Sequence, residues 1–468
     1  MASCSSRVPT TTSIATCRRS GDFGTQALTV GNSAAANASF TETLAGVFGT
    51  PTTGIIATGS VTGIVGQGSN RSSMIVGISD TTAGQKTGSV TVGFTSQAVS
   101  GSGLSDTALA AQNVGVTGFA YTGQSLWINP GSGSWGNNVN AFGNWDLAGG
   151  VPGLDGALSI NDTATFGDAI SAPATVRLDG ANPSLSAVTF DQASQAYTLA
   201  QGSGGTLILK GSGGPATVTV ANGSHTISTP LSLATNATVT VANASDTLTV
   251  AGPVAGSDYG ITKDGAGTLT LTGTSSYTGR TDVTLGTLKV NGRIASAVKV
   301  DSRGILAGTG ATGAVTLENG GTLAPGDSTV NNGIGIITAT GHSAWETGAV
   351  YEWQLGQVEP LLVLQPVGAN PAANYDQFNL ASGTLAVSAG FEFKLASGDT
   401  TPTGWDPSKD YEWIVAKTGG TITNAAGGTL NPGIIALDAS GVKWGDPANF
   451  YFTLGGANNS ELVLNYRG

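Results

Sequence analysis

A Gly-Thr-Leu triplet that returns at a nearly fixed interval constrains the fold of this chain more than any other feature. From Gly267 through Gly286 and Gly304 to Gly321, the successive spacings are 19, 18 and 17 residues. The triplet begins at Gly205, Gly267, Gly286, Gly321, Gly383 and Gly428, with a Gly-Ile-Leu variant at Gly304. A unit this short cannot bury its apolar face alone, so the repeat predicts a solenoid of stacked coils, of the parallel β-helix type.

Residues around the triplet alternate between apolar and polar side chains, which is the period of a β-strand. We therefore expect the apolar set to face inward, with the intervening Thr and Lys facing outward. The expected inward set is Leu269, Leu271, Val283, Leu285, Leu288 and Val290. Gly286 interrupts the alternation and predicts a bend or bulge. Asn-Gly pairs at 222–223, 291–292 and 319–320 predict turns, because both residues tolerate positive φ.

Composition extends the all-β prediction to the whole chain. The sequence holds 72 glycines and only 10% charged residues, which on their own would also suit a disordered chain. Val, Leu and Ile nevertheless recur throughout in alternation with Thr and Ser, as on a pleated and half-buried surface. No long stretch has the apolar spacing of a helix, so we expect an all-β protein.

The charge of the chain argues against a nucleic-acid partner, and its hydropathy argues against a membrane-spanning helix. The net charge of −11 and the pI near 4.5 argue against nucleic acid, whose binding depends on Lys and Arg. The densest apolar run, at 361–364, is far shorter than the ~18 residues of a membrane-spanning helix. We therefore expect no transmembrane segment in this chain.

The first 23 residues have the composition of a leader. They contain both cysteines, Cys4 and Cys17, which we interpret as unpaired thiols, with a disulfide as the alternative. The segment lacks the apolar core of a signal peptide. We expect a disordered leader at 1–23 and an N-terminus that is truncated or misassigned if the protein is exported.

Composition and the spacing of the expected strands divide the remainder of the chain into three regions. Residues 24–124 contain short strands at ~8–12-residue spacing, which predicts an Ig-like β-sandwich with Val90, Val92 and Phe94 on one face. Residues 125–330 are the expected β-helix. Residues 331–468 are richer in aromatics and predict a continuation closed by an aromatic-rich β cap, because a solenoid needs an atypical terminal element to blunt its edge.

Three tryptophans, Trp127, Trp135 and Trp145, lie close together at the start of the β-helix region. Exposed indole rings in a row would form a platform for stacking on sugars. The simpler interpretation is that the rings cap the end of the β stack.

Residues 260–292, "GITKDGAGTLTLTGTSSYTGRTDVTLGTLKVNG", resemble the autotransporter-associated β-strand repeat, also called the passenger-associated transport repeat. The resemblance rests on "GTLTLTG", "YTG" and "GTLKVNG"; "GGTLAPGDS" and "YDQFNL" look like its usual continuation. The N-terminal region resembles the Ig-like modules called choice-of-anchor D. The repeat resemblance implies a right-handed, pectin-lyase-like β-helix, often the passenger of an autotransporter. The residues after Gly326 are too few for a typical membrane barrel, so we expect outer-membrane association only through a missing or separate element.

Four acidic residues recur near the repeat glycines: Asp264, Asp282, Asp301 and Glu318. Stacked coils would bring them to one edge, where a row of carboxylates could bind Ca²⁺ or supply paired acids for glycoside cleavage. Lys263, Arg280 and Arg303 stand beside three of them, so solvated ion pairs are the simpler interpretation.

The two histidines, His225 and His342, have no recognisable Ser or Asp partner motif, and we interpret both as turn or strand residues. We find no catalytic, cofactor-binding or metal-binding set. We therefore expect a secreted or cell-surface structural or adhesive β-solenoid of a Gram-negative bacterium, without catalytic activity or cofactor. The alternatives are a carbohydrate-active β-helix (polysaccharide lyase or hydrolase) and a glycan-binding module; surface glycans or other surface proteins are the expected partners.

Overall fold

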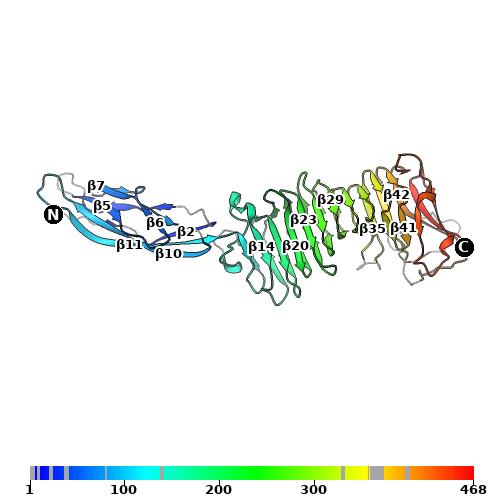
Figure 1. Cartoon of the computed structure of the whole chain (residues 1–468), viewed down its shortest axis with the longest axis horizontal. Helices are drawn as coiled ribbons and strands as arrows, with labels where there is room; N and C mark the ends of the chain where they lie inside the picture. The colour runs from blue at the N-terminus through cyan, green and yellow to red at the C-terminus, as the bar shows by residue number, and fades with distance from the viewer. Residues whose placement is uncertain are drawn as a thin grey trace. The chain divides into compact units, whose positions relative to one another are not determined.

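The computed structural model describes residues 6–7, 11–19, 25–35, 42–79, 82–136, 142–327, 333–356, 358, 374–395 and 401–468. The chain divides into two compact units (Figure 1). The first comprises Met1–Ser125 and Val139–Val151, and the second comprises Leu126–Asn138 and Pro152–Gly468.

The first unit is built from mainly antiparallel sheets around one apolar core. Its largest sheet has the strand order β2 (Thr11–Arg19), β11 (Thr107–Tyr121), β10 (Gly84–Gln97), β5 (Thr43–Phe48), β7 (Ser60–Ile64). The smaller sheets are β1 (Ser6–Arg7), β4 (Val30–Asn32), β8 (Ser69–Asn70) and β3 (Thr25–Ala27), β9 (Ile75–Ile78), β6 (Ile55–Thr58). Val90, Val92 and Phe94 are all buried in the core, which confirms their predicted common face.

The predicted disordered leader at 1–23 is wrong for the residues that the structure describes. β2 pairs in parallel with β11 along the edge of the large sheet. Its sequence, TTSIATCRR, is rich in the small and β-branched residues that suit a strand. Cys4 lies outside the described residues, so the cysteine interpretation stays a prediction.

The second unit is a parallel β-helix with two long faces of twelve strands each. The first long sheet runs β12 (Gln124–Leu126), β14 (Thr163–Phe166), β17 (Ala187–Asp191), β20 (Ala216–Asn222), β23 (Ala237–Val241), β26 (Ile261–Asp264), β29 (Thr281–Val283), β32 (Val298–Val300), β34 (Val315–Leu317), β37 (Ser343–Trp345), β40 (Leu385–Val387), β43 (Ile422–Asn424). The second long sheet runs β13 (Gly133–Ser134), β15 (Ala174–Arg177), β18 (Tyr197–Ala200), β21 (His225–Ile227), β24 (Thr247–Val250), β27 (Thr268–Leu271), β30 (Gly286–Val290), β33 (Gly304–Gly308), β35 (Thr322–Pro325), β38 (Val350–Trp353), β41 (Glu392–Leu395), β44 (Ala436–Asp438).

A third face is formed by shorter sheets. These are β16 (Ser184–Leu185), β19 (Leu207–Leu209), β22 (Leu231–Leu233), β25 (Val254–Ala255), and then β28 (Thr274–Ser275) with β31 (Arg293–Ile294). The described 3₁₀ turns are Phe142–Asn144, Gly156–Asn161, Pro432–Ile434 and Pro447–Asn449. No helix of the described residues has the length and hydropathy to cross a bilayer.

Side chains of the coils alternate between a buried interior and the surface, as the sequence pattern predicts. In β23, Ala237, Val239 and Val241 are buried, whereas the threonines between them are partly exposed. Val239 pairs with Val218 of the preceding coil, so like side chains stack on like. Each coil thereby buries its apolar face only against its neighbours.

The repeat glycines stack as predicted. Gly286 pairs with Gly304, and the flanking pairs Thr268↔Thr287 and Ile305↔Thr322 extend the same register to Gly267 and Gly321. All the expected inward residues of this segment except Leu285 are buried. Leu285 is half-buried because the chain turns at Gly286, whose φ is +70°. That positive φ confirms the predicted bend.

The C-terminal end changes strand direction and closes with aromatic residues. The sheet β36 (Ile336–Thr340), β39 (Gln377–Ser382), β42 (Tyr411–Thr418), β46 (Glu461–Tyr466), β45 (Phe450–Gly455) is parallel as far as β42 and antiparallel beyond it. Trp405 stacks on Tyr411 at 4.7 Å and meets Trp444 edge-on at 4.4 Å. An antiparallel hairpin ends the parallel stack, as the predicted aromatic-rich cap requires.

Candidate functional site

The predicted acidic row lies on the outer face of the first long sheet, in two columns. The register is continuous from Lys263 through Val283 and Val300 to Leu317, which pair strand by strand. Asp264, Asp301 and Glu318 directly follow three of these residues, so the three carboxylates lie in one column. Asp282 pairs with Thr262 and Lys299, so it lies two positions earlier on the same face. The stacking therefore brings Asp301 and Glu318 together, while Asp264 and Asp282 stand apart from them.

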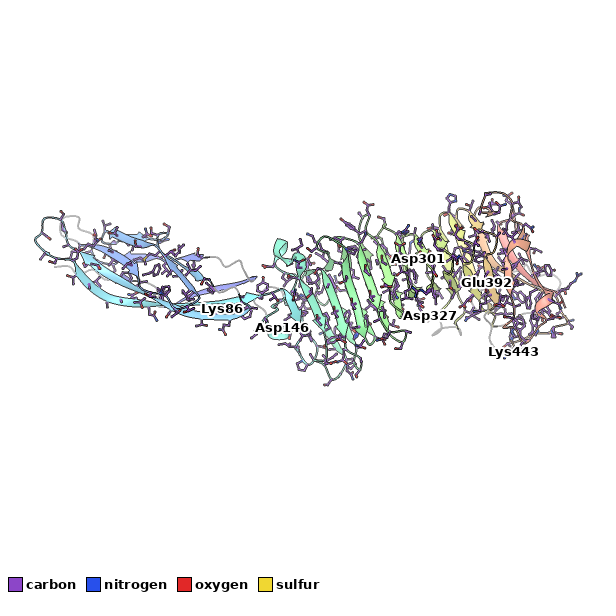
Figure 2. All side chains as sticks on the ribbon, in the orientation of Figure 1. Lys86, Asp146, Asp301, Asp327, Glu392 and Lys443 are labelled. Carbon is purple, nitrogen blue, oxygen red and sulfur yellow. The ribbon has the colours of Figure 1, made fainter. Side chains whose placement is uncertain are left out.

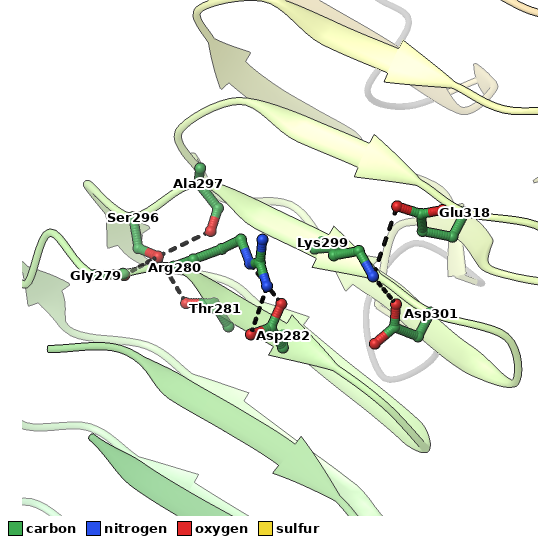
Figure 3. A network of polar contacts seen from close by, with 9 residues as sticks. All are labelled: Gly279, Arg280, Thr281, Asp282, Ser296, Ala297, Lys299, Asp301 and Glu318. Carbon is green, nitrogen blue, oxygen red and sulfur yellow. Dashed lines mark hydrogen bonds and ion pairs between the residues drawn. The ribbon is translucent and has the colours of Figure 1, made fainter.

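Basic side chains neutralise most of this row (Figure 3). Arg280 Nε lies 2.6 Å from Asp282 Oδ1 and Nη2 lies 3.3 Å from Oδ2, an arrangement that raises the pKa of Arg280. Lys299 Nζ contacts the Asp301 carboxylate and lies 3.6 Å from Glu318 Oε1. Its hydrogen bond to Asp301 raises the pKa of Lys299. The basic partner of Asp301 is thus Lys299, whereas the sequence suggested the neighbouring Arg303.

Lys263 departs most from the sequence interpretation, which placed it in a solvated ion pair. Its side chain occupies an interior position, in register with Val239 and Val283, and is 0% exposed. Nζ donates to the main-chain oxygens of Asp264 (2.8 Å), Gly265 (2.7 Å) and Leu285 (3.0 Å). Burial lowers the pKa of Lys263 to about 8, against an opposing effect of the Asp264 charge. The expected outward placement of this lysine is therefore wrong; the alternation that begins at Ile261 is the signal that could have found its inward position.

A polar recess of about 200 Å³ opens beside the Arg280–Asp282 pair. It lies where three successive turns enter β23, β26 and β29. Its lining is Asn236, Asp258, Gly260, Thr262, Gly279, Arg280 and Asp282. No sequence motif signalled this recess, because its residues come from three coils and meet only when the coils stack.

A second polar cluster lies on the second long sheet and joins the repeat to its "GGTLAPGDS" continuation. Lys289 Nζ lies 2.8 Å from Asp327 Oδ1, and Asn291 Nδ2 lies 2.6 Å from Oδ2. Figure 2 labels Asp327 and Asp301, which lie in the middle coils of the β-helix. Both oxygens of Asp327 are therefore occupied by side chains of a coil that precedes it.

Neither histidine is placed for acid–base work with a serine in the described part of the chain. His225 is buried against Phe190, with ring centroids 4.8 Å apart, and its Nδ1 accepts from Tyr197 N at 3.1 Å. Its Nε2 lies 2.9 Å from Asn222 O, and burial lowers the pKa of the ring. His342 Nδ1 lies 2.8 Å from Thr384 Oγ1. These are the strand and turn positions that the sequence predicts.

The tryptophans do not form a sugar platform, because Trp127, Trp135 and Trp145 are each 0% exposed. Trp127 and Trp135 pack on Phe166 at centroid distances of 6.2 and 6.1 Å, beside the first coil of the β-helix. Trp145 belongs to the other unit, so the predicted end cap is made by two rings rather than three. Glycan binding through this cluster is therefore excluded by burial.

The described residues hold no group of three or more His, Cys, Asp or Glu side chains arranged to bind a metal ion. Salt bridges or hydrogen bonds with neighbouring side chains engage all four carboxylates of the acidic row. The outer face of the repeat thus offers charged hydrogen-bonding groups and the polar recess.

Comparison with known proteins agrees with this architecture. Residues 261–290 match the Passenger-associated-transport-repeat family. The chain is 30% identical over 337 residues to the Adhesin BmaC autotransporter of Brucella suis biovar 1 (strain 1330), covering 64% of this chain and 8% of that protein. It is 39% identical over 92 residues to an Extracellular serine protease of Serratia marcescens, covering 20% of this chain and 8% of that protein.

A second Extracellular serine protease of Serratia marcescens is 35% identical over 96 residues, 20% of this chain and 9% of that protein. The chain thus spans less than a tenth of the length of each of these relatives. The match falls on coils whose glycines and leucines stack in register, and the parallel β-helix of the second unit carries an autotransporter-associated, passenger-type transport repeat.

Proposed function

We propose that this chain is a non-catalytic segment of a secreted or cell-surface protein of a Gram-negative bacterium, serving as a structural and adhesive β-solenoid. The observation that carries the proposal is the pair of twelve-stranded parallel sheets around a filled apolar interior. Such a stack presents long outer faces and turns for contact with other surfaces. The relative named as an adhesin aligns with 64% of the chain, which favours the adhesive role.

The absence of catalysis is part of the proposal and rests on the polar groups. The relatives named as serine proteases match only one fifth of the chain. Both histidines are engaged by main-chain atoms or a threonine. Asp282, Asp301 and Glu318 are held in ion pairs with Arg280 and Lys299, which ties up the carboxylates that an acid–base mechanism would use.

Surface display tests the adhesive role. Bacteria that present the chain on an unrelated outer-membrane anchor should attach to host cells or glycan-coated surfaces more than bacteria with the anchor alone. Leu288→Asp places a charge in the interior and should abolish attachment, whereas the adjacent outward substitution Thr287→Asp should preserve it. Equal attachment with and without the chain would remove the adhesive role.

Enzyme assays test the second half of the proposal. The purified chain should leave casein, gelatin and a panel of acidic and neutral polysaccharides intact. Cleavage of any of these that is lost in His225→Ala, His342→Ala or Asp282→Ala would show that the segment is an enzyme.

A further inference from the structure

The polar recess arises where turns of different length lie side by side. The turn before β23 is residues 234–236, whereas the turns before β26 and β29 are 256–260 and 276–280. The two longer turns stack, with Asp258 N donating to Thr278 Oγ1 at 2.9 Å and Thr278 N donating to Gly256 O at 3.2 Å. The shorter turn beside them leaves room for the recess of about 200 Å³.

Glycines fix the walls of this recess. A Cβ at Gly260 would lie 2.0 Å from Arg280 O, and a Cβ at Gly279 would lie 2.2 Å from the carbonyl carbon of Tyr259. The two turns therefore contact each other through main-chain atoms, which holds the side chains at the rim in defined positions. Asp258 has a φ of +66°, a left-handed conformation set by the same turn.

Several polar groups at the recess lack partners among the described residues. The Asp258 carboxylate accepts no hydrogen bond, and Arg280 Nη1 donates none, because the contacts to Asp282 use Nε and Nη2. Asn236 uses Oδ1 to accept from Gly260 N at 2.9 Å, which leaves its Nδ2 as a donor. Thr262 adds a free hydroxyl. Donors and acceptors are thus mixed around one small volume, the pattern that a polyhydroxylated ligand needs.

The size of the recess limits its occupant. Pockets for drug-sized ligands measure roughly 300–1,000 Å³, so this one suits a single ring. Its volume corresponds to about six or seven water molecules, which the hydroxyl groups of a sugar ring can replace. The lining is entirely polar side chains and glycines, so hydrogen bonds rather than ring stacking would hold the ligand.

Charge selects among sugars. Asp282 neutralises Arg280, and the remaining charge of the recess is the carboxylate of Asp258. This excess of negative charge opposes uronates, sialic acids and sulfated sugars. We propose that the recess binds one neutral hexopyranose ring of a surface glycan, with Asp258 and Asn236 hydrogen-bonding its hydroxyls.

This inference rests on the proposed adhesive role, and it names the ligand class of that role. The test is a glycan array that contains neutral, amino, sialylated, uronate-containing and sulfated glycans, probed with the whole chain. Neutral hexose-terminated glycans should bind, and titration with the corresponding free monosaccharide should give the affinity. Binding confined to acidic glycans, or no binding, overturns the proposal.

Two variants locate the site. Asp258→Gly removes the carboxylate without strain at positive φ, and Asn236→Asp removes the Nδ2 donor while keeping an oxygen to accept from Gly260 N. Each should weaken hexose binding about tenfold or more, the effect of one lost hydrogen bond. Asn458→Asp, at an exposed asparagine of the C-terminal cap, is the matched control and should bind as the unmodified chain does.

Unchanged thermal midpoints for all three variants establish that losses are local. Equal affinities of Asp258→Gly, Asn236→Asp and the unmodified chain overturn the assignment of the recess. Attachment of displaying bacteria separates the two proposals. If bacteria that display Asp258→Gly still attach and no neutral glycan binds the chain, the recess proposal fails and the adhesive role stands. If the chain binds hexose but bacteria that display it do not attach, the recess proposal stands and the adhesive role fails.

Discussion

Lys289 and Asp327 form an ion pair across two coils, with Nζ 2.8 Å from Oδ1 and side chains only 16% and 8% exposed. Asn291 Nδ2 donates a hydrogen bond to the other carboxylate oxygen, Asp327 Oδ2, at 2.6 Å. The pair joins β30 to the end of β35, with β33 lying between them. Removing one member of an ion pair this far from solvent is costly, because the other charge then stays buried without a partner.

Asp327→Ala should therefore destabilise the β-helix by about 3 kcal/mol. The matched control is Asp301→Ala, which breaks the more exposed pair with Lys299 and should cost about 1 kcal/mol or less. Thermal unfolding followed by circular dichroism measures both. The double variant Lys289→Met/Asp327→Ala should recover part of the loss; equal midpoints for Asp327→Ala and Asp301→Ala would contradict the prediction.

The buried Lys263 predicts a pH dependence of stability. Its pKa is lowered to about 8 in the folded chain from an ordinary 10.5, so the unfolded chain holds this proton more tightly. The group is protonated in both states below pH 8, where its destabilising effect is largest. Stability therefore rises as pH increases from about 8 toward 10.5, by at most about 1.4 kcal/mol per pH unit.

Urea unfolding at pH 7.5 and pH 9.5 measures this effect in the unmodified chain and in Lys263→Met. The variant has no titrating group at this position, so the gain between the two pH values should be smaller in it. Lys210→Met, at an exposed lysine of the same β-helix, is the control that should keep the rise in stability between the two pH values. Identical gains in Lys263→Met and the unmodified chain would show that Lys263 does not titrate in this window.

Interior and outer positions of one strand should respond differently to truncation. Leu288 is 0% exposed and stacks on Leu269 and Leu306, whereas the adjacent Thr287 is partly exposed. Leu288→Ala should cost about 2–5 kcal/mol because it leaves a cavity, and Thr287→Ala about 0.5 kcal/mol or less. Comparable losses in thermal unfolding would mean that the strand does not pack with the register described.

The coils were predictable because their signal is local and repeated. Alternation with a period of two fixes which side of a strand is buried, and the spacing of Gly267, Gly286, Gly304 and Gly321 fixes which coil positions stack. The same logic extends to Lys263. Alternation counted from Ile261 places this lysine inward, but its charge led us to expect a solvated ion pair, and that expectation is wrong.

Features that depend on distant segments could not be predicted from the sequence. The recess needs side chains from three coils. β2 is a strand because β11, about a hundred residues later, supplies its hydrogen-bonding edge. Trp145 lies near Trp135 in sequence but in the other unit, and only the folded chain assigns it there.

Gly286 should be costly to replace by any other residue. Its φ of +70° strains any other residue, and an added Cβ would lie 2.4 Å from Gly265 O and 2.6 Å from Gly267 O, both main-chain atoms of the preceding coil. Gly213 has a φ of +78° but open space around its Cβ position, so it isolates the conformational cost. Gly213→Ala should cost about 1–2 kcal/mol.

Gly286→Ala adds the clash to that strain and should cost roughly 2–3 kcal/mol more, because main-chain atoms of a packed coil have little freedom to move. Thermal midpoints of the two variants measure the difference directly. Equal midpoints would mean that neighbouring coils can move apart at this bend. The close contact between coils would then not explain why position 286 needs glycine.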